Sequence, residues 1–175
     1  FEEIRKAFED EDSAFLYSRG KNPTIEILRK KLAALDGAED ALVFNSGASA
    51  IFAAVLANVG AGDHIISVDK PYSWAWRMFD NMLPRFHVKT TYVDGTRIEN
   101  FEKALLPETR IIYLESPNSN TFELQDLEAV AKLAKERSGG WTPFLDFITG
   151  KLSAEVRRRY AVDPARQALF GHSLG

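Results

Sequence analysis

The sequence predicts an α/β fold in which a mainly parallel sheet is covered by helices on both faces. Strand-like apolar runs alternate with helix-like segments along most of the chain. This alternation requires crossover connections, and strands joined by crossovers lie parallel in a sheet that is buried on both faces. In such sheets, ligands bind where the strands end and loops lead into helices. The strand-like runs lie at 41–44, 64–68, 88–93 and 110–115, and the helix-like segments at 48–59, 73–83, 97–106 and 124–137.

The composition is that of an ordinary globular domain. The chain has 175 residues, enough for a sizeable core, of which 45% are hydrophobic and 27% charged. The net charge of −3, with Lys and Arg scattered among acids, gives no electrostatic case for nucleic acid. Cysteine is absent, which excludes disulfides and thiolate metal sites, and we expect no other metal site. No apolar run approaches the roughly 18–20 residues that span a bilayer, so we expect no membrane segment and take the cytoplasm as the default location.

The N-terminal part is expected to be an arm, residues 1–22, followed by an amphipathic helix. The charged residues of the arm favour a short helix within it. Asn22 or Thr24 can cap the next helix, and Pro23 suits its first turn. Gly37 suits its end. The apolar face of this helix repeats at helical spacing and comprises Ile25, Leu28, Leu32 and Leu35.

A turn of small residues, in VFNSGASA at 43–50, leads from a strand-like run into a helix. The backbone amides of Gly47 and Ala48 are free at such a helix start and can bind an anion, helped by the helix dipole. The Ser46 hydroxyl can add a hydrogen bond, and small side chains let a phosphate come close. A tight turn capped by Ser46 explains the same residues, so both interpretations stay open.

Two further strand ends carry aromatic or polar residues. Tyr72 follows one strand-like run and can either lay its ring on a flat cofactor or pack in the core. Glu115, Asn118 and Ser119 follow another, where a polar turn containing a proline is the alternative. Because the carboxyl ends of parallel strands meet at one edge of the sheet, these residues are candidates for a common site.

Together, these motifs resemble the trans-sulfuration (Cys/Met metabolism) family of pyridoxal-phosphate enzymes. The likeness runs from about Tyr17 to about Lys135 and includes YSRGKNPT, LRKKLAALDGAEDALVFNSGASAI, GDHIISVDKPYSW and LESPNSNTFELQDLEAVAKLAK. The last motif is most similar to the cystathionine β-lyase branch. The resemblance implies pyridoxal 5'-phosphate as cofactor and a cofactor-binding domain of fold type I over residues 23–137. It also implies a C–S lyase or γ-synthase that acts on cystathionine or related sulfur amino acids.

The resemblance assigns a phosphate site to residues from two subunits. Tyr17 and Arg19 would reach the cofactor phosphate of a neighbouring subunit, so a homo-oligomer is expected, a dimer or a dimer of dimers. An arginine fork suits a phosphate dianion. Gly47 and Ala48 match the backbone amides that bind the same phosphate, with the Ser46 hydroxyl beside them.

Other positions match residues around the cofactor ring. Tyr72 matches the residue that stacks on the pyridine ring, and it is the expected catalytic residue. Glu115 and Ser119 are expected to contact the cofactor, although many relatives carry an asparagine where Ser119 stands. The polar turn is therefore a weaker match than the phosphate site.

The family also uses an acid at the ring nitrogen and a lysine that holds the cofactor covalently. Asp146 falls near the expected place of the acid, but the apolar stripe at 144–160 predicts a helix with Asp146 off its apolar face. Lys151 lies within that helix without the Ser-x-Thr-Lys motif, as a solvated surface lysine does. We therefore expect the chain not to turn over substrate.

The C-terminal part, residues 138–175, resembles a different family. Its last five residues, GHSLG, follow the short strand-like run QALF and form a Gly-x-Ser-x-Gly nucleophile elbow. The run-up LSAEVRRRYAVDPARQALF resembles α/β-hydrolase esterases of the enterochelin-esterase type. Ser173 would be the nucleophile of such an enzyme, whereas His172 beside it is not the triad base. His64 and His87 are expected to be structural.

Two interpretations of this C-terminal part stay open. The HSLG sequence also matches a degraded start of the lysine segment, and a lysine after Gly175 would favour that alternative. On the hydrolase interpretation, the chain joins parts of two α/β proteins, as a chimera or a truncated product without catalytic activity. Because the chain begins with Phe1 and stops inside a motif, we expect a fragment.

Overall fold

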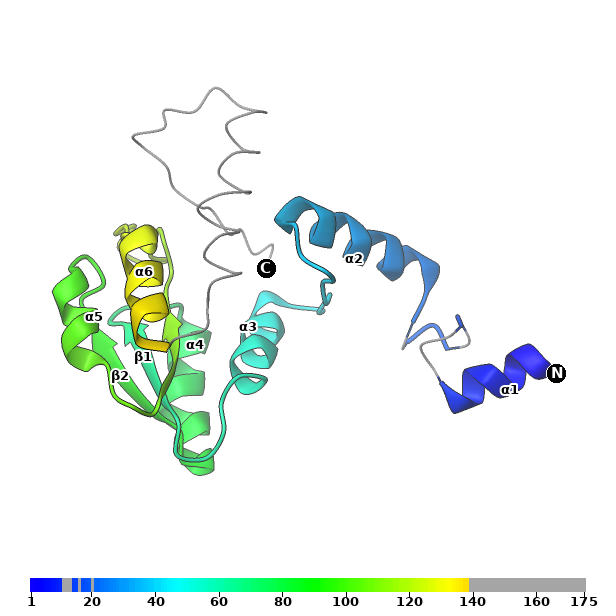
Figure 1. Cartoon of the computed structure of the whole chain (residues 1–175), viewed down its shortest axis with the longest axis horizontal. Coiled ribbons are helices and arrows are strands. Elements are labelled where there is room, and N and C mark those ends of the chain that lie inside the picture. Colours follow the sequence, from blue (N-terminus) through cyan, green and yellow to red (C-terminus); the bar gives the residue numbers. More distant parts are fainter. Residues whose placement is uncertain (11–13, 16, 20, 139–175) are drawn as a thin grey trace, which may run out of the picture. The chain divides into compact units, whose positions relative to one another are not determined.

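The computed structural model describes residues 1–10, 14–15, 17–19 and 21–138. They fall into two compact units, Phe1–Phe44 and the part that begins at Asn45 (Figure 1). Each unit is described by itself. The helix expected at 144–160 and the strand expected at QALF lie outside the described residues.

The described residues of the first unit form two helices, as the sequence predicts. Helix α1 spans Glu2–Glu9 and helix α2 spans Pro23–Asp36. Of the two candidate caps, Asn22 is the N-cap, and its side chain accepts a hydrogen bond of 3.0 Å from the amide of Ile25. Gly37 ends α2 in the left-handed conformation, with φ 63°, which glycine adopts without steric cost.

The prediction of a strand at 41–44 is wrong. These residues form no strand, and the side chains of Leu42, Val43 and Phe44 are exposed. The carbonyl oxygen of Ala41 accepts a 2.8 Å hydrogen bond from Nε of Arg29 in α2. An apolar run forms a strand only where a neighbour supplies ladder hydrogen bonds, and here a side chain takes the Ala41 carbonyl instead.

The second unit contains a parallel sheet of three strands in its described part. β1 (His64–Val68) is central, and β2 (Lys89–Val93) and β3 (Thr109–Tyr113) flank it. In the register of the sheet, Ile66 is paired with Thr91 on one side and with Ile112 on the other. Three of the four predicted strands are thus confirmed, and all are parallel.

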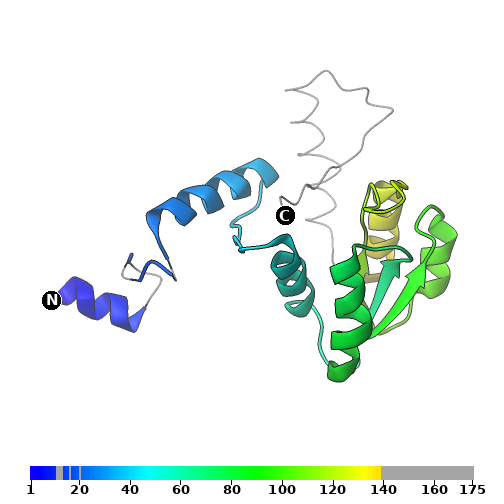
Figure 2. The same ribbon diagram turned by 180° about the vertical axis from the view of Figure 1, so that it is seen from behind.

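Helices cover both faces of this sheet, as Figures 1 and 2 show. One side carries α3 (Gly47–Leu56), α4 (Ser73–Arg77), the π-helical turn η2 (Met78–Met82) and the 3-10 turn η3 (Leu83–Phe86), and the other carries α5 (Ile98–Ala104) and α6 (Leu127–Ser138). The predicted fold class, a parallel α/β sheet with helices on both faces, is confirmed.

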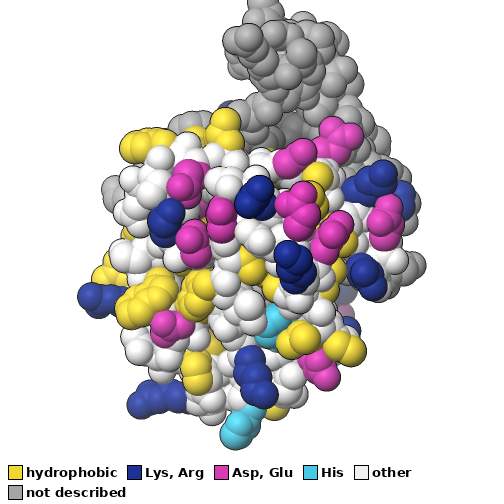
Figure 3. Space-filling view, turned by 90° about the vertical axis from the view of Figure 1, so that its left-hand side faces the viewer, with side chains coloured by type: hydrophobic (Ala, Val, Ile, Leu, Met, Phe, Trp, Pro, Cys, Tyr) yellow, Lys and Arg dark blue, Asp and Glu magenta, His cyan; other side chains and the backbone are white. Residues whose placement is uncertain are grey.

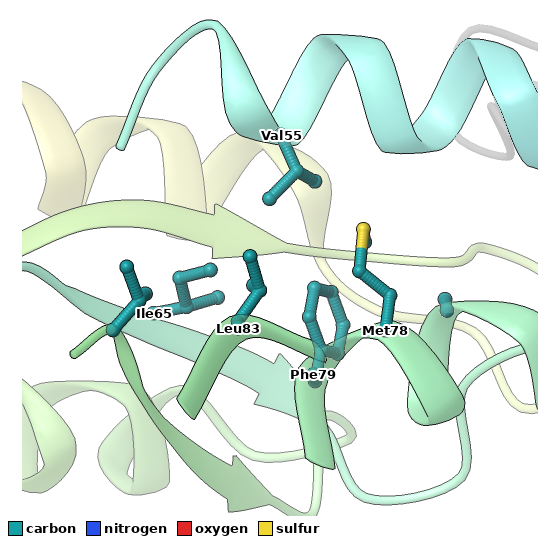
Figure 4. Packing of buried hydrophobic residues seen from close by; sticks show 7 residues of the cluster. Val55, Ile65, Met78, Phe79 and Leu83 are labelled. Atoms are coloured by element: carbon teal, nitrogen blue, oxygen red, sulfur yellow. The ribbon is translucent and has the colours of Figure 1, made fainter. Parts of the chain in front are cut away.

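The central strand contributes to a separate hydrophobic cluster on each face, because successive side chains of a strand point to opposite sides. Ile65 faces the α3 and α4 side, where it packs with Val55, Met78, Phe79 and Leu83 (Figure 4). On the other face, the cluster comprises Ile66, Val68, Val93, Phe101, Val130 and Leu133. Both layers of helices are therefore fixed to β1, which is buried along its whole length.

One face of the molecule shows the charge pattern expected from the composition. Acidic and basic side chains are mixed across this face, with apolar groups between them, and neither sign forms a continuous patch (Figure 3). Within the described ranges, no helix combines the length and the apolar character needed to cross a membrane.

Candidate functional site

The start of α3 presents two backbone amides that donate no hydrogen bond within the described residues. Ser46 is the N-cap of the helix, and its Oγ accepts a 3.1 Å hydrogen bond from the amide of Ser49. The amide of Ala50 donates to the carbonyl of Ser46 at 3.1 Å. The amides of Gly47 and Ala48 remain unpaired, at the positive end of the helix dipole. The Ser46 cap is therefore confirmed, and it is compatible with an anion-binding start of the helix, which stays a prediction.

This helix start faces the same edge of the sheet as the strand ends. Helix α3 leads through its C-terminal end into the beginning of β1, so α3 runs against the direction of the strands (Figure 1). Its packing against α4 and β1 through Val55 and Ile65 keeps it on that face. Gly47, Tyr72 and Glu115 therefore all belong to the end of the second unit at which parallel sheets bind ligands.

Glu115 connects two of the predicted site residues. Its Oε1 accepts a 2.7 Å hydrogen bond from the backbone amide of Tyr72, at the start of α4. Its Oε2 accepts a 2.9 Å hydrogen bond from Oγ of Ser119. The structure thus brings together Tyr72, Glu115 and Ser119, which the sequence places up to 47 positions apart. The Tyr72 ring is partly exposed, so it is accessible for stacking.

The Glu115 carboxylate also accepts a third hydrogen bond, which the sequence does not predict. The hydroxyl of Tyr113, the last residue of β3, donates a 2.9 Å hydrogen bond to Oε1 of Glu115. Burial and the neighbouring Glu115 carboxylate raise the pKa of Tyr113 well above its usual range. The hydroxyl therefore stays protonated near neutral pH and can donate to the carboxylate. The only feature of the sequence that points to this contact is the position of Tyr113 two residues before Glu115, on the same face of the predicted strand.

Asn118 has a structural position rather than a ligand-binding one. Its side chain is buried, and Nδ2 donates a 2.7 Å hydrogen bond to the carbonyl of Lys70. Its Oδ1 accepts hydrogen bonds from the amides of Asn120 and Thr121, at 3.0 and 3.3 Å. These three bonds fix the polar turn that the sequence predicts at this strand end.

An ion pair adds a further link between the loops that follow β1 and β3. Nζ of Lys70 lies 3.3 Å from Oε1 of Glu123. This hydrogen bond is the leading cause of the raised pKa of Lys70, and Asp69 adds to the shift. With the bonds of Glu115 and Asn118, three connections hold the Tyr72 loop against the loop after β3.

The other predicted residues lie elsewhere. Tyr17 and Arg19 belong to the first unit, where the Arg19 guanidinium lies 4.9 Å from the centre of the Tyr17 ring. Asp146, Lys151, His172 and Ser173 lie outside the described residues. In the part of the chain that the structure describes, no group of three or more His, Asp or Glu side chains is arranged to hold a metal ion.

The two described histidines are not in the candidate site. His64 is buried at the beginning of β1, where its Nδ1 and Nε2 each lie 2.8 Å from a threonine Oγ1, of Thr109 and Thr91 respectively. His87 ends η3 in a left-handed conformation and is exposed. The geometry of His64 agrees with the structural role expected for it, and the role expected for His87 stays a prediction.

The residues at the strand ends fit a phosphorylated, flat cofactor. Two unpaired amides at the start of a helix, bordered by the small side chain of Ser46 and by Gly47, which has none, suit a phosphate dianion. The exposed ring of Tyr72 suits a flat heteroaromatic ring. This combination makes the strand-end edge of this α/β protein a candidate site for such a cofactor.

Comparison with known proteins gives the family. A model of the family described as Cys/Met metabolism PLP-dependent enzyme matches residues 1–150. Cystathionine beta-lyase MetC of Staphylococcus haemolyticus is 38% identical over 164 residues, which cover 93% of this chain and 42% of the relative. The protein of the same name from Bacillus subtilis is 34% identical over 168 residues, which cover 94% and 42%.

Solved structures agree with this assignment. Cystathionine gamma-lyase from Lactobacillus plantarum, complexed with L-serine, has a TM-score of 0.65 and 35% identity, over 69% of this chain and 32% of the other. The metB structure from Corynebacterium glutamicum has a TM-score of 0.67 and 32% identity, over 70% and 32%. The chain therefore belongs to the Cys/Met metabolism family of pyridoxal-phosphate-dependent enzymes. It spans less than half the length of either MetC relative.

The resemblance of residues 138–175 to an esterase finds no support in these comparisons. The family model continues to residue 150, beyond the junction expected at 138. A match that covers 93% of the chain extends further into the same segment. None of the four relatives reported above is named as an esterase or a hydrolase.

Proposed function

We propose that this chain forms the cofactor-binding part of a trans-sulfuration enzyme, a C–S lyase or γ-synthase that acts on cystathionine or a related sulfur amino acid. The observation that carries this proposal is the pair of unpaired amides, of Gly47 and Ala48, at the edge of the sheet that also holds Tyr72. The names of the relatives support the substrate class, since they include cystathionine beta-lyases and L-methionine gamma-lyases. The cytoplasm remains the expected location.

The cofactor of this family is pyridoxal phosphate, whose ring withdraws electrons from the carbon that loses a proton or a leaving group. In the proposed arrangement, the amides of Gly47 and Ala48 bind the phosphate, and the Ser46 hydroxyl lies beside them. The Tyr72 ring covers one face of the pyridine and excludes water from it. Glu115 acts by fixing the backbone of Tyr72, and Ser119 steadies the Glu115 carboxylate.

Residues of a second subunit complete the proposed phosphate site. Arg19 supplies a bidentate cation for the dianion, and Tyr17 supplies a hydroxyl donor. This contribution makes a homodimer, or a dimer of dimers, the functional assembly. Sedimentation of the chain with and without pyridoxal phosphate tests it, with dimers expected in the presence of the cofactor.

Turnover requires the acid and the lysine of the family. Asp146 is the proposed acid, and no lysine of this chain stands in the Ser-x-Thr-Lys motif. We therefore propose that this chain binds the cofactor without converting substrate. Detection of elimination products from cystathionine would contradict this part of the proposal.

Binding of the phosphate at α3 is tested by removing one backbone amide hydrogen while the helix stays folded. Ser46 already has an extended backbone, with φ −157° and ψ 152°, which suits a residue before proline, and Gly47 is the first helical residue. Gly47→Pro thus deletes the amide hydrogen, and Gly47→Ala is the matched control that keeps it. Since one charge-assisted hydrogen bond is worth about 1.5–3 kcal/mol, we expect the proline variant to bind pyridoxal phosphate at least about tenfold more weakly than the alanine variant.

The readout is equilibrium dialysis with pyridoxal phosphate and with pyridoxal, which lacks the phosphate. The wild-type chain should prefer pyridoxal phosphate, and Gly47→Pro should lose most of this preference. Circular dichroism checks that the helix content is unchanged in both variants. Equal affinity of the wild-type chain for the two compounds would contradict a phosphate site at α3.

A further inference from the structure

Tyr113 is anchored firmly in the core beside the candidate site. Its ring packs partly buried against the cluster that contains Val55 and Phe79. The ring centres of Tyr113 and Phe79 lie 5.1 Å apart, and the ring planes meet at 77°, in the edge-to-face arrangement that aromatic pairs prefer. The Tyr113 hydroxyl therefore has a defined position before any ligand arrives.

The hydroxyl of Tyr113 and the amide of Tyr72 share one acceptor atom. Oε1 of Glu115 lies 2.9 Å from the Tyr113 hydroxyl and 2.7 Å from the Tyr72 amide nitrogen. A glutamate side chain that is free in solution has many rotamers, and ordering it opposes any contact that it makes. The bond from Tyr113 to Oε1, together with the 2.9 Å bond that Oε2 accepts from Ser119, favours the rotamer in which the carboxylate reaches Tyr72.

The Tyr72 amide has no regular backbone partner in the described structure to replace this carboxylate. Tyr72 is the N-cap residue of α4, and its amide is bonded to Glu115. The carbonyl of Tyr72 accepts from Trp76 at 3.0 Å, which fixes only the other side of the residue. Loss of the carboxylate's orientation therefore loosens Tyr72 directly.

We propose that Tyr113 is a positioning residue, which holds Glu115 so that the Tyr72 ring stands in its cofactor-binding place before the cofactor binds. This inference rests on the proposed function, because the value of a fixed Tyr72 ring lies in contact with the cofactor. Tyr113 itself touches neither cofactor nor substrate. Preorganisation of this kind raises affinity by reducing the ordering that binding requires.

Tyr113→Phe is the test, because it removes the hydroxyl and keeps the packed ring. Tyr92→Phe is the matched control. The Tyr92 hydroxyl donates a 2.7 Å hydrogen bond to Asp80, not to Glu115, and its ring packs against the same cluster. Both variants lose one tyrosine hydroxyl that is bonded to a carboxylate.

The first measurement is hydrogen exchange at the Tyr72 amide in the chain without cofactor. Tyr113→Phe should speed exchange at this amide by about three- to tenfold, the effect expected when a hydrogen bond is weakened rather than lost. Exchange at Ile66 in β1 should stay unchanged, and Tyr92→Phe should leave Tyr72 unchanged. Unaltered exchange at Tyr72, or an equal increase at Ile66, would overturn the proposal.

The second measurement is binding of pyridoxal phosphate to the full chain. Tyr113→Phe should weaken binding by about three- to tenfold and reduce the induced circular dichroism of the bound cofactor, whereas Tyr92→Phe should do neither. Equal affinity and equal dichroism in the wild type and Tyr113→Phe would overturn the role toward the cofactor. If the wild-type chain binds no pyridoxal phosphate, the proposed function fails and this role fails with it, while the exchange data still decide whether Tyr113 positions Tyr72.

Discussion

Nδ2 of Asn118 lies 2.7 Å from the carbonyl oxygen of Lys70, and this hydrogen bond joins the loops that follow β3 and β1. The two residues are 48 positions apart in the sequence. Asn118 is almost fully buried, and its backbone amide also donates to the carbonyl of Glu123 at 2.8 Å. One buried amide side chain thus joins the two strand-end loops that carry the candidate site, beside the bond of Glu115 and the Lys70–Glu123 ion pair.

Asn118→Ala is expected to destabilise the second unit. The change leaves the Lys70 carbonyl and the amides of Asn120 and Thr121 without their side-chain partner. Buried polar groups left unpaired cost about 1–3 kcal/mol each, and partial access of water reduces the sum, so we expect a loss of about 2 kcal/mol. Urea unfolding followed by circular dichroism measures it.

Asn120→Ala is the control for this prediction. Asn120 is exposed, and the hydrogen bond that it makes to Asn118 uses its backbone amide, which alanine keeps. Its unfolding midpoint should stay close to that of the wild type. Equal stability of the two variants would show that the Asn118 side chain does not hold the loops together.

The Glu115 carboxylate is expected to act through its shape more than through its charge. Glu115→Gln keeps an oxygen that can accept from Tyr72 and Tyr113, and its amide group can donate to the Ser119 hydroxyl. Glu115→Ala removes all three bonds. We expect the alanine variant to lose about 2 kcal/mol and the glutamine variant less than about 1 kcal/mol. Thermal unfolding of both variants distinguishes them, and a glutamine variant as unstable as the alanine variant would show that the negative charge is required.

Gly95 is expected to tolerate no side chain. A Cβ at this position would lie 2.6 Å from Cγ1 of Val68 and 3.0 Å from Cγ of Gln125, closer than atoms pack in proteins. Because Gly95 is buried next to β1, the strand cannot move without disturbing the core. Gly95→Ala should therefore destabilise the protein by about 1–3 kcal/mol, measured by urea unfolding.

Gly60→Ala is the matched control for Gly95. There the nearest atom to an added Cβ is Oδ2 of Asp63, at 3.7 Å, an ordinary contact. The variant should unfold within about 0.5 kcal/mol of the wild type. A small effect at Gly95 as well would mean that β1 and the loop after β2 can separate without cost.

The sequence predicts the sheet well where strands are buried on both sides. The run HIISV at His64–Val68 is apolar and bounded by turn residues, and it forms β1 with the predicted bounds. The run ALVF at 41–44 has the same local pattern but no strand beside it in the described structure. The local pattern indicates a tendency to form a strand. A strand forms only if another strand pairs with it, and that partner lies far away in the sequence.

The candidate site likewise has some features that the sequence predicts and others that depend on packing. The positions of Tyr72 and Glu115 follow from the rule that parallel strands end at one edge, and the sequence predicts their grouping. Gly47 does not follow from this rule, because residues 41–44 form no strand, and α3 is held on the sheet by packing through Val55 instead. The hydrogen bonds of Tyr113 and Asn118 do not follow, because they depend on side-chain directions set by packing across the sheet. The roles expected for Arg19 and Asp146 stay predictions.

The stability of the protein is expected to fall as the pH decreases below about 6.5, through His64. Burial lowers the pKa of His64 from its ordinary value of 6.5, with Lys89 acting in the same direction and Glu108 opposing it. The unfolded chain therefore takes up a proton at a higher pH than the folded chain. The free energy of unfolding is unaffected well above pH 6.5 and decreases below it, by at most about 1.4 kcal/mol per pH unit for one proton. Urea unfolding between pH 5 and pH 8 measures the slope.

Two variants separate His64 from other groups in this pH range. His64→Gln removes the titrating ring, so the variant should be less stable at pH 8, where it loses the ring's bridge between Thr91 and Thr109, but should show a smaller decrease between pH 7 and pH 5. His87→Asn is the control for replacing a histidine, because His87 is exposed at a φ of 60°, which asparagine tolerates, and its free energy of unfolding at pH 8 should stay close to that of the wild type. An unchanged slope in His64→Gln would show that other groups cause the acid sensitivity, because the imidazole that joins all three strands would then titrate equally in the folded and unfolded chain.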